Sequence, residues 1–238
     1  MIASRSLRRL LFVAVAALCL PGCGPGRTAP SDANEDRVPD VPPIDATKPT
    51  KNSIAELCER LKIKPEPGMF TISEGQIREV RLNNADIKDI SPLEGLPLTH
   101  LNLLGTQVED ISVVKTLNLN TLWLNGTRVK DLSPLKGKSL ESLDITGTPV
   151  TDLSPLKGMT SLRRLKLSHS KVTDLTPLNG LKLQRIIFNP AVVTRGLDAV
   201  RNMASLKHMH TRFQTDPRRY FSPAKFWDEY DKGTLPPE

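Results

Sequence analysis

A row of recurring carboxylates is the first group in this chain whose residue type and spacing could do chemistry. The carboxylates occur at a nearly constant interval, at Asp89, Asp110, Asp131, Asp152 and Asp174. Such a row can bind a hard cation such as calcium. Each aspartate, however, stands two residues before a Ser or Thr, where a carboxylate accepts backbone N–H groups of a local turn. We therefore expect turn-forming aspartates and no metal site, with calcium as the alternative.

The remaining reactive side chains do not predict catalysis. The sequence has no Gly-rich phosphate loop and no local signature of a kinase or a serine hydrolase. His208 and His210 would face the same side of the fold, but no acid and nucleophile accompany them. Cys58 falls on the apolar side of an expected helix, where a cysteine is a small buried hydrophobe. We expect neither an enzyme nor a cofactor.

Short repeats are the elements that must position any binding residue. Their clearest copy, LESLDITGTPVTDLSPLKG, covers residues 140–158. Its first apolar position recurs at Ile77, Leu98, Leu119, Leu140, Leu162, Leu183 and Leu206. The pattern Leu-x-x-Leu-x-Leu is that of a leucine-rich repeat, in which each copy forms one turn of a coil with one short strand. We predict an α/β solenoid over residues 76–211, in which about seven short parallel strands form a concave face.

Trp123 stands out among the side chains that point away from this predicted sheet. A large aromatic side chain on an open sheet surface is a typical centre of a binding interface. The residues that we predict to bind a protein or peptide partner are Trp123, Asn102, Leu104, His100, Asp144, Arg164, Lys166 and Arg185. The basic residues among them would suit an anionic partner. The alternative for Trp123 is that loops pack over it and hide it.

Two further columns of polar residues are predicted to stabilise the coils. One column consists of Thr106, Thr127, Thr148 and Ser170, whose hydroxyls would bond backbone groups along the stack. The other consists of Ser-Pro or Thr-Pro pairs that begin at residues 91, 133, 154 and 176. There Ser or Thr would cap a short helical turn on the convex side, with Pro at its first position. Ser112-Val113 breaks this pattern, so we expect a less regular turn in the second repeat.

Both ends of the stack need a cap, because an open end exposes core and strand edge to water. Residues 52–75 predict an N-terminal cap, in which Ser53 and Glu56 have capping-box spacing before a helix and Glu74-Gly75 turns a hairpin. Residues 190–203 predict a longer helical segment than the earlier turns. Residues 212–238 hold most of the aromatic side chains and predict a C-terminal cap helix that begins at Ser222-Pro223. A partner-docking helix is the alternative there.

The beginning of the chain indicates export and a lipid anchor. Three arginines at residues 5, 8 and 9 precede an apolar run over residues 10–20, which is shorter than the roughly 20 residues that span a bilayer. The run ends in Leu-Pro-Gly-Cys at Cys23, which resembles the lipobox of bacterial lipoproteins. That resemblance implies a signal peptide over residues 1–22 and a lipid on Cys23 that holds the protein in a membrane. An ordinary secretory signal is the alternative.

Residues 23–51 are polar and proline-rich, which predicts a disordered stalk between the lipid and the folded part. Gly24 stands where an Asp would hold a lipoprotein on the inner membrane, so we expect the outer membrane. Removing the signal peptide takes away three of the 33 basic residues and none of the 26 acidic ones, which leaves a net charge of about +4. This weak charge and the expected export argue against nucleic-acid binding. We expect a monomer.

The repeats resemble the internalin-type leucine-rich repeats of bacteria. The segments that carry the resemblance are GTRVKDLSPLKGK, GTPVTDLSPLKGM and HSKVTDLTPLNGL. They are also similar to repeats found in lipoproteins and beside serine/threonine kinases, and the resemblance covers residues 76–211. It implies a non-catalytic protein that binds other proteins at the bacterial envelope through its concave face, without naming a partner. A structural spacer without a specific ligand is the alternative.

Overall fold

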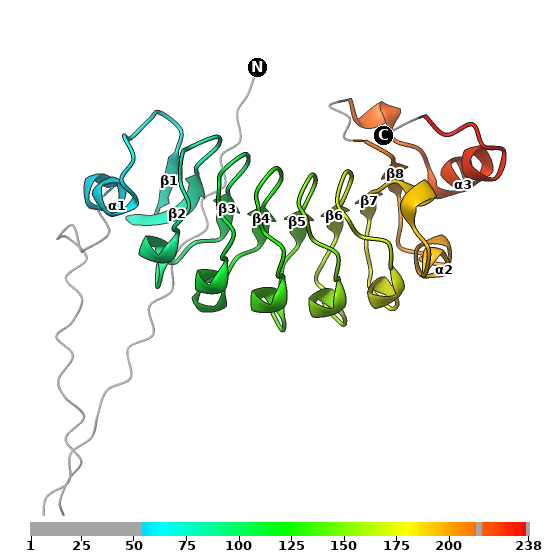
Figure 1. Cartoon of the computed structure of the whole chain (residues 1–238), viewed down its shortest axis with the longest axis horizontal. Coiled ribbons are helices and arrows are strands. Elements are labelled where there is room, and N and C mark those ends of the chain that lie inside the picture. The colour runs from blue at the N-terminus through cyan, green and yellow to red at the C-terminus, as the bar shows by residue number, and fades with distance from the viewer. Residues whose placement is uncertain (1–53, 213–215, 237–238) are drawn as a thin grey trace, which may run out of the picture. The chain divides into compact units, whose positions relative to one another are not determined.

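The computed structural model describes residues 54–212 and 216–236 of the 238-residue chain, and these residues form one stack of coils (Figure 1). Its single sheet has eight strands in sequential order. The strands are β1 (Phe70–Ser73), β2 (Gln76–Arg81), β3 (His100–Asn102), β4 (Thr121–Trp123), β5 (Ser142–Asp144), β6 (Arg164–Lys166), β7 (Arg185–Ile187) and β8 (His208–His210). Strand β1 pairs antiparallel with β2, and all later neighbours are parallel. The predicted seven-strand solenoid is therefore confirmed.

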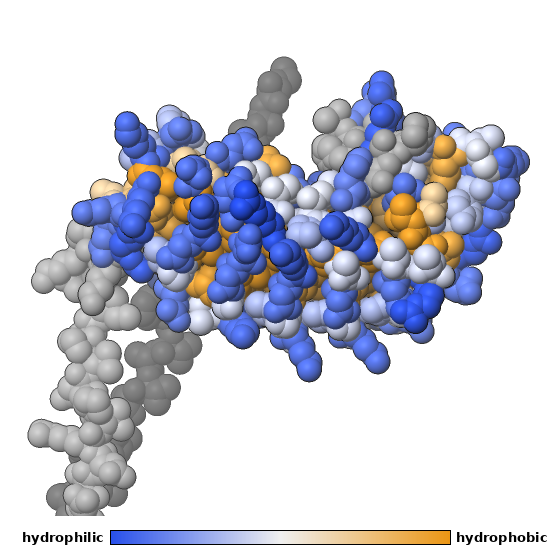
Figure 2. All heavy atoms as spheres, in the orientation of Figure 1, coloured by the Kyte–Doolittle hydropathy of each residue, from blue (hydrophilic) through white to orange (hydrophobic). Residues whose placement is uncertain are grey.

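The register of the sheet follows from the alternation of side chains along each strand. The middle residues of neighbouring strands pair in register, as Leu101 pairs with Leu122 and Leu122 with Leu143. All three are buried, so the residues on either side of them point out of the sheet. Apolar residues consequently gather in a band that follows the stack, with hydrophilic residues along its borders (Figure 2). One turn alone cannot bury its apolar face, so the core exists only because the coils stack.

Short 3-10 helices form the side of the stack opposite to the return loops. Apart from η6 (Pro190–Val192) and η7 (Pro217–Arg219), which come after β7 and β8, they are η1 (Ser91–Leu93), η2 (Ser112–Thr116), η3 (Ser133–Leu135), η4 (Ser154–Leu156) and η5 (Thr176–Leu178). The turn η2 has five residues where the other repeat turns have three. The less regular turn expected at Ser112-Val113 is thus a longer one.

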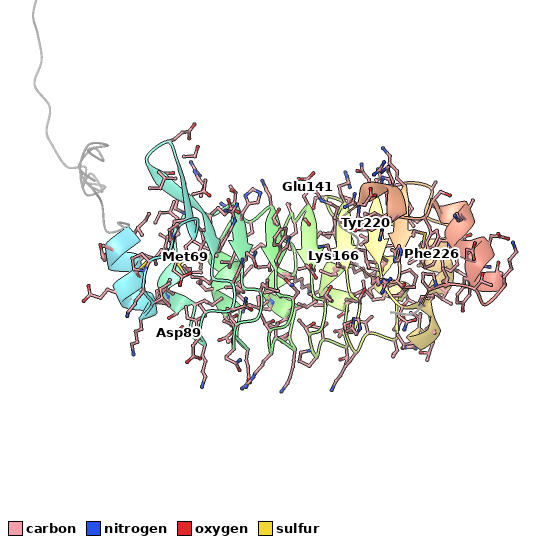
Figure 3. All side chains as sticks on the ribbon, turned by 90° about the horizontal axis from the view of Figure 1, so that it is seen from above. Met69, Asp89, Glu141, Lys166, Tyr220 and Phe226 are labelled. Atoms are coloured by element: carbon pink, nitrogen blue, oxygen red, sulfur yellow. The ribbon has the colours of Figure 1, made fainter. Side chains whose placement is uncertain are left out.

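The aspartate row organises these turns, and Figure 3 shows one member, Asp89, at the edge of the stack opposite to Glu141. Asp131 Oδ1 accepts the backbone N–H of Ser133 at 2.7 Å, and its Oδ2 accepts the Ser133 hydroxyl at 2.6 Å. These bonds lower the pKa of the Asp131 carboxyl. The predicted local role of the aspartates is confirmed. The predicted Ser cap is wrong, because Ser133 is the first residue of η3 and its hydroxyl bonds Asp131 instead of the helix.

The column of buried hydroxyls also differs from the prediction. Thr127 Oγ1 donates to the carbonyl of Leu124 at 2.6 Å, and Thr148 Oγ1 donates to that of Ile145 at 2.7 Å. Both acceptors lie three residues earlier in the same coil, not in the next coil along the stack. At this place in the coil the hydroxyl closes the loop after its own strand, whereas hydroxyls at another position, such as that of Ser161 on the Leu140 carbonyl, do bond the preceding coil.

The N-terminal cap consists of helix α1 (Ile54–Leu61) and the β1–β2 hairpin. The helix buries Leu57, Cys58 and Leu61 against the first coil. The hairpin turns at Glu74 and Gly75, which both have positive φ values, 54° and 70°. Two positive φ values suit the tight turns that join twisted antiparallel strands. The predicted cap is confirmed, while the capping residue Ser53 lies outside the described residues.

The sixth turn is not the long helix expected over residues 190–203. It consists of η6 and, after a break, the short helix α2 (Leu197–Arg201). Within the break, Arg195 forms a parallel bridge with Asp174 of the preceding coil, and their side chains form an ion pair at 2.7 Å. Pairing with the previous coil therefore overrides the local helical tendency.

Helix α3 (Pro223–Asp231) closes the other end of the stack. The Ser222 hydroxyl accepts the backbone N–H of Lys225, so the predicted start of this helix is confirmed. Phe226 and Trp227 are buried, and the Phe226 ring stacks on Phe188 of the last regular coil at 5.8 Å between centroids. This packing covers the core, as the cap prediction requires.

Candidate binding face

Two columns of side chains on the side of the sheet away from the core form what we call the sheet face, and some of their members, such as Asp144, Ile187 and His210, are buried there. The first column contains Glu79, His100, Thr121, Ser142, Arg164, Arg185 and His208. The second contains Arg81, Asn102, Trp123, Asp144, Lys166, Ile187 and His210. The columns run across the strands because each residue is paired in register with its counterpart on the next strand. Neighbours within a column lie about 4.8 Å apart.

A hollow of about 390 Å³ opens on this face. Its lining comes from strands β2 to β7: Glu79, His100, Leu101, Asn102, Thr121, Trp123, Ser142, Arg164, Leu165, Lys166 and Arg185. Six of the residues predicted to bind a partner are among them, and Leu104 and Asp144 are not. Glu79, Thr121 and Ser142 line it too, although the sequence did not single them out. The sequence could have indicated these three residues, because they belong to the same outward column as His100, Arg164 and Arg185.

Trp123 is the large apolar side chain that the hollow presents to solvent. It keeps 39% of its surface exposed and follows the buried Leu122 on strand β4. Lys166 Nζ lies 5.7 Å from the centroid of its ring, which is within the range of a cation–π contact. Lys166 in turn pairs with Asp144 at 3.1 Å. A charged pair thus lies against the ring, and about two fifths of the side chain stays open to solvent.

Asn102 and Asp144 have a structural task that the sequence did not reveal. Asn102 Oδ1 accepts the backbone N–H of Leu104 at 3.0 Å, and Asp144 Oδ1 accepts that of Thr146 at 3.0 Å. Both side chains are buried, and Asp144 is only 5% exposed. They shape the bend after their strands, and Leu104 lies on that bend. Of Asn102, Asp144 and Leu104, only Asn102 lines the hollow, so it is the one of the three that a partner in the hollow could contact.

The N-terminal end of the hollow is electrically balanced. Glu79 pairs with Arg81 at 2.8 Å and accepts the Thr71 hydroxyl of β1 at 2.9 Å. His100 is exposed, and its Nδ1 lies 2.9 Å from the Thr99 hydroxyl. The carboxylate here is therefore already satisfied by the fold, and this end offers a partner little net charge.

The opposite end of the hollow is positively charged. Arg164 on β6 and Arg185 on β7 are paired in register, and Lys166 follows Arg164 on the same outward side. Arg164 is exposed and Arg185 is half-buried. The guanidinium carbon of Arg185 lies 4.7 Å from the centroid of the Tyr220 ring, which comes from the segment beyond β8. The charge along the sheet face is thus concentrated at strands β6 and β7.

Tyr220 shows how the C-terminal segment closes the sheet face. Phe221 exchanges two backbone hydrogen bonds with Met209 of β8, both at 2.9 Å, so the chain returns antiparallel beside the last strand. Tyr220, labelled in Figure 3, makes edge contacts with the rings of His208 and His210. Burial and the nearby Arg212 lower the pKa of His210. Repeat periodicity could not place Tyr220 here, because the reversal lies beyond the last repeat.

The sheet face offers an aromatic surface and cations. In the part of the chain that the structure describes, no cluster of three or more His, Cys, Asp or Glu is arranged to hold a metal ion. None of the described helices has the length and apolar character needed to cross a bilayer. The arrangement can hold apolar and anionic groups in place, which is the chemistry of recognition.

Comparison with known proteins agrees with this architecture. The family model for leucine-rich repeats (two copies) matches residues 138–180. An internalin (inlF) from Listeria monocytogenes is 24% identical with a TM-score of 0.50, and the match covers 67% of this chain. The chain spans 56% of the length of that internalin. No curated protein sequence matches the chain.

Two other solved structures show weaker overlap. An internalin C2 (inlC2) from Listeria monocytogenes is 27% identical with a TM-score of 0.48, over 56% of this chain and 70% of its own. The ectodomain of the plant receptor kinase GASSHO1/SCHENGEN3 from Arabidopsis thaliana, solved in complex with CASPARIAN STRIP INTEGRITY FACTOR 2, is 16% identical with a TM-score of 0.42. That match covers 62% of this chain and 19% of the ectodomain. The sheet, the family match and the first internalin together show that this chain has the leucine-rich repeat solenoid fold.

Proposed function

We propose that this protein is a non-catalytic binding module that holds a protein or peptide partner on its sheet face. The observation that carries the proposal is Trp123, which a charged pair holds in the hollow with 39% of its surface open to solvent. Interfaces depend most on Trp, Tyr and Arg side chains near their centre. Trp123 has the hollow on both sides of it, from Glu79 on β2 to Arg185 on β7.

The proposal is tested by asking whether the Trp123→Ala variant still captures the partner that the parent chain captures. The full chain, purified in detergent, is used as bait in envelope extracts, and captured proteins are compared between variants. Val192→Ala is the matched control, because Val192 is also a large exposed apolar residue but lies on η6, away from the hollow. We expect the control to capture the same partner as the parent chain, and Trp123→Ala to lose about 2 kcal/mol or more of binding free energy.

Stability must be followed in the same experiment. About three fifths of the Trp123 surface is buried, so the Ala variant should lose up to about 2–3 kcal/mol of unfolding free energy from lost apolar burial. Capture is therefore compared at equal amounts of folded protein, measured by circular dichroism. If folded Trp123→Ala captures the same proteins as the parent, Trp123 is not the binding centre. If neither chain captures a protein, the structural-spacer alternative becomes the better account.

A lipid on Cys23 would place this binding module at the envelope of a bacterium. The support is the Arg-rich start, the short apolar run and the Leu-Pro-Gly-Cys sequence; Cys23 lies outside the described residues. In this proposal the protein is exported, anchored by its lipid, preferably in the outer membrane, and monomeric. Cys23→Ser should move the protein from the membrane fraction to the soluble fraction and abolish metabolic labelling with a fatty acid. Unchanged fractionation and labelling would eliminate the lipid anchor.

A further inference from the structure

Two arginines face each other at the charged end of the hollow without a carboxylate between them. Arg164 and Arg185 are register partners on β6 and β7, so their backbones are about 4.8 Å apart and their side chains leave the sheet on the same side. Within residues 54–212 and 216–236 no carboxylate pairs with either guanidinium group. Like charges that are directly opposite on neighbouring strands repel each other. Among the described residues, the fold therefore holds two positive charges on β6 and β7 without a carboxylate that neutralises them.

The surroundings of the pair prepare it for an external acceptor. The Tyr220 ring covers one face of the Arg185 guanidinium, with the guanidinium carbon 4.7 Å from the ring centroid. Stacking of this kind uses the flat face of the group and leaves its in-plane N–H donors for hydrogen bonds. Nε of Arg185 is buried without an acceptor among the described residues, so the fold leaves donors of this side chain unmatched. A bound carboxylate would supply both charge and acceptors.

The nearby carboxylate of Asp144 does not serve the pair. It is buried, accepts the backbone N–H of Thr146 and pairs with Lys166 at 3.1 Å. Glu79, the carboxylate that lines the hollow, pairs with Arg81 and lies four and five strands away from Arg164 and Arg185. The positive charge of the arginine pair is thus available to a partner, and the apolar surface of Trp123 lies two strands from Arg164.

We propose that the partner is an acidic peptide segment that crosses the strands, with one Asp or Glu carboxylate between Arg164 and Arg185 and one apolar side chain on Trp123. This inference rests on the proposed function and specifies its partner. Measured across the strands, β6 lies about 10 Å and β7 about 14 Å from β4, which carries Trp123. An extended chain advances about 3.3 Å per residue, so the apolar residue and the acidic residue are separated by three or four positions.

A single-stranded nucleic acid is a less suitable occupant, although it also combines anions with stacking groups. Binding of such a strand needs a track of cations along its backbone. The N-terminal half of the hollow instead contains the Glu79–Arg81 ion pair and the exposed His100. One local pair of arginines beside one aromatic ring matches one carboxylate and one apolar side chain of a peptide.

The experiment selects peptides without assuming a natural partner. A random peptide library displayed on phage is panned against the full chain in detergent, and the enriched sequences are examined. We expect an Asp or Glu three or four positions from a large apolar residue. One enriched peptide and its amide counterpart, in which that Asp or Glu becomes Asn or Gln, are then synthesised. Their dissociation constants are measured by fluorescence anisotropy for each protein variant.

Arg164→Gln and Arg185→Gln should each raise the dissociation constant of the acidic peptide about tenfold and leave that of the amide peptide nearly unchanged, as in a double-mutant cycle. Arg128→Gln is the matched control, because Arg128 is an exposed arginine that does not line the hollow. It should change neither affinity. Arg164→Gln should leave the free energy of unfolding nearly unchanged, whereas Arg185→Gln also loses the stacking on Tyr220. The dissociation constants are therefore compared at equal amounts of folded protein, measured by circular dichroism.

Three other outcomes overturn the inference, and they separate it from the proposed function. Peptides that depend on Trp123 but carry no acidic residue, or bind equally well to both arginine variants, remove the carboxylate site and leave the binding module intact. Binding of an oligonucleotide that is tighter than any peptide and depends on the arginine pair assigns the site to nucleic acid. If no peptide is enriched and envelope extracts also yield no partner, both proposals fail.

Discussion

Gly196→Ala tests the tightest backbone contact between coils. Gly196 has φ of 78° and lies directly against the preceding turn. A Cβ atom there would lie 2.3 Å from the backbone nitrogen of Thr176 and 2.6 Å from the carbonyl carbon of Leu175. The neighbouring Arg195 carbonyl accepts the N–H of Leu175 at 2.9 Å, which holds the two segments together. No flexible side chain can yield at this point, because the obstructing atoms are backbone.

The expected loss of unfolding free energy follows from a comparison with Gly180. This residue has nearly the same φ, 79°, but no atom would lie within 4 Å of a Cβ atom added there. A residue with a Cβ atom that adopts the left-handed backbone conformation costs roughly 1–2 kcal/mol, so Gly180→Ala should lower the free energy of unfolding by about that much. Gly196→Ala has the same cost and must also separate the two backbones by more than about 1 Å, because carbon atoms normally stay 3.5–4.0 Å apart. Loss of the local hydrogen bond and packing should add about 3 kcal/mol or more.

The assay is urea unfolding of the full chain followed by circular dichroism. For a domain of this size the slope is about 2–3 kcal/mol per molar urea, so the Gly196 variant should unfold at least about 1 M earlier than the Gly180 variant. Both variants share the backbone penalty, and the difference between them isolates the contact. Equal midpoints for the two variants would refute the close approach between residues 175–176 and 196.

Two other substitutions test the register and the turns. Leu143→Ala should cost about 2–5 kcal/mol because Leu143 is 1% exposed, whereas the exposed Glu141→Ala should cost under about 0.5 kcal/mol; equal losses in urea would mean a shifted register. Hydrogen bonds from the Ser133 hydroxyl and N–H lower the pKa of Asp131 from 3.8, so the stability that this carboxylate contributes is complete above that value and is lost as the pH falls through the lower folded-state pKa. Asp131→Asn should therefore show a smaller loss of unfolding free energy than the parent chain when acidified from about pH 5 to about pH 2, and an identical acid profile would contradict the assignment.

The repeat period was enough to predict the regular part of the fold. A spacing of 21 to 23 residues between apolar positions requires coils of equal length, and equal coils stack their strands in register. Local hydrogen bonds could be predicted for the same reason. The bond from the N–H of Ser133 to Asp131 spans two residues, so its geometry depends little on the rest of the molecule.

The candidate site was only partly visible in the sequence. Alternation along a strand shows that Trp123 points outward, but the exposed fraction of its ring depends on Lys166 of β6, two strands away. The same alternation placed Asp144 among the binding residues. In the folded chain its side chain turns into the bend at Thr146 and is buried, because an unpaired carboxylate gains more from a backbone N–H and a lysine than from solvent.

The sequence by itself determined the solenoid, the register of β2 to β8 and the columns of the sheet face, because all three follow from one periodic pattern of apolar residues. Tertiary structure alone decided what happens where that pattern stops. It broke the expected helix at Gly196, against the backbone of Thr176, and brought Tyr220 back over Arg185. These contacts join segments that have no common period. Their formation depends on packing at the end of the stack. Pairing of Arg195 with Asp174 interrupts the helix, and ring contacts hold Tyr220 against the last strand.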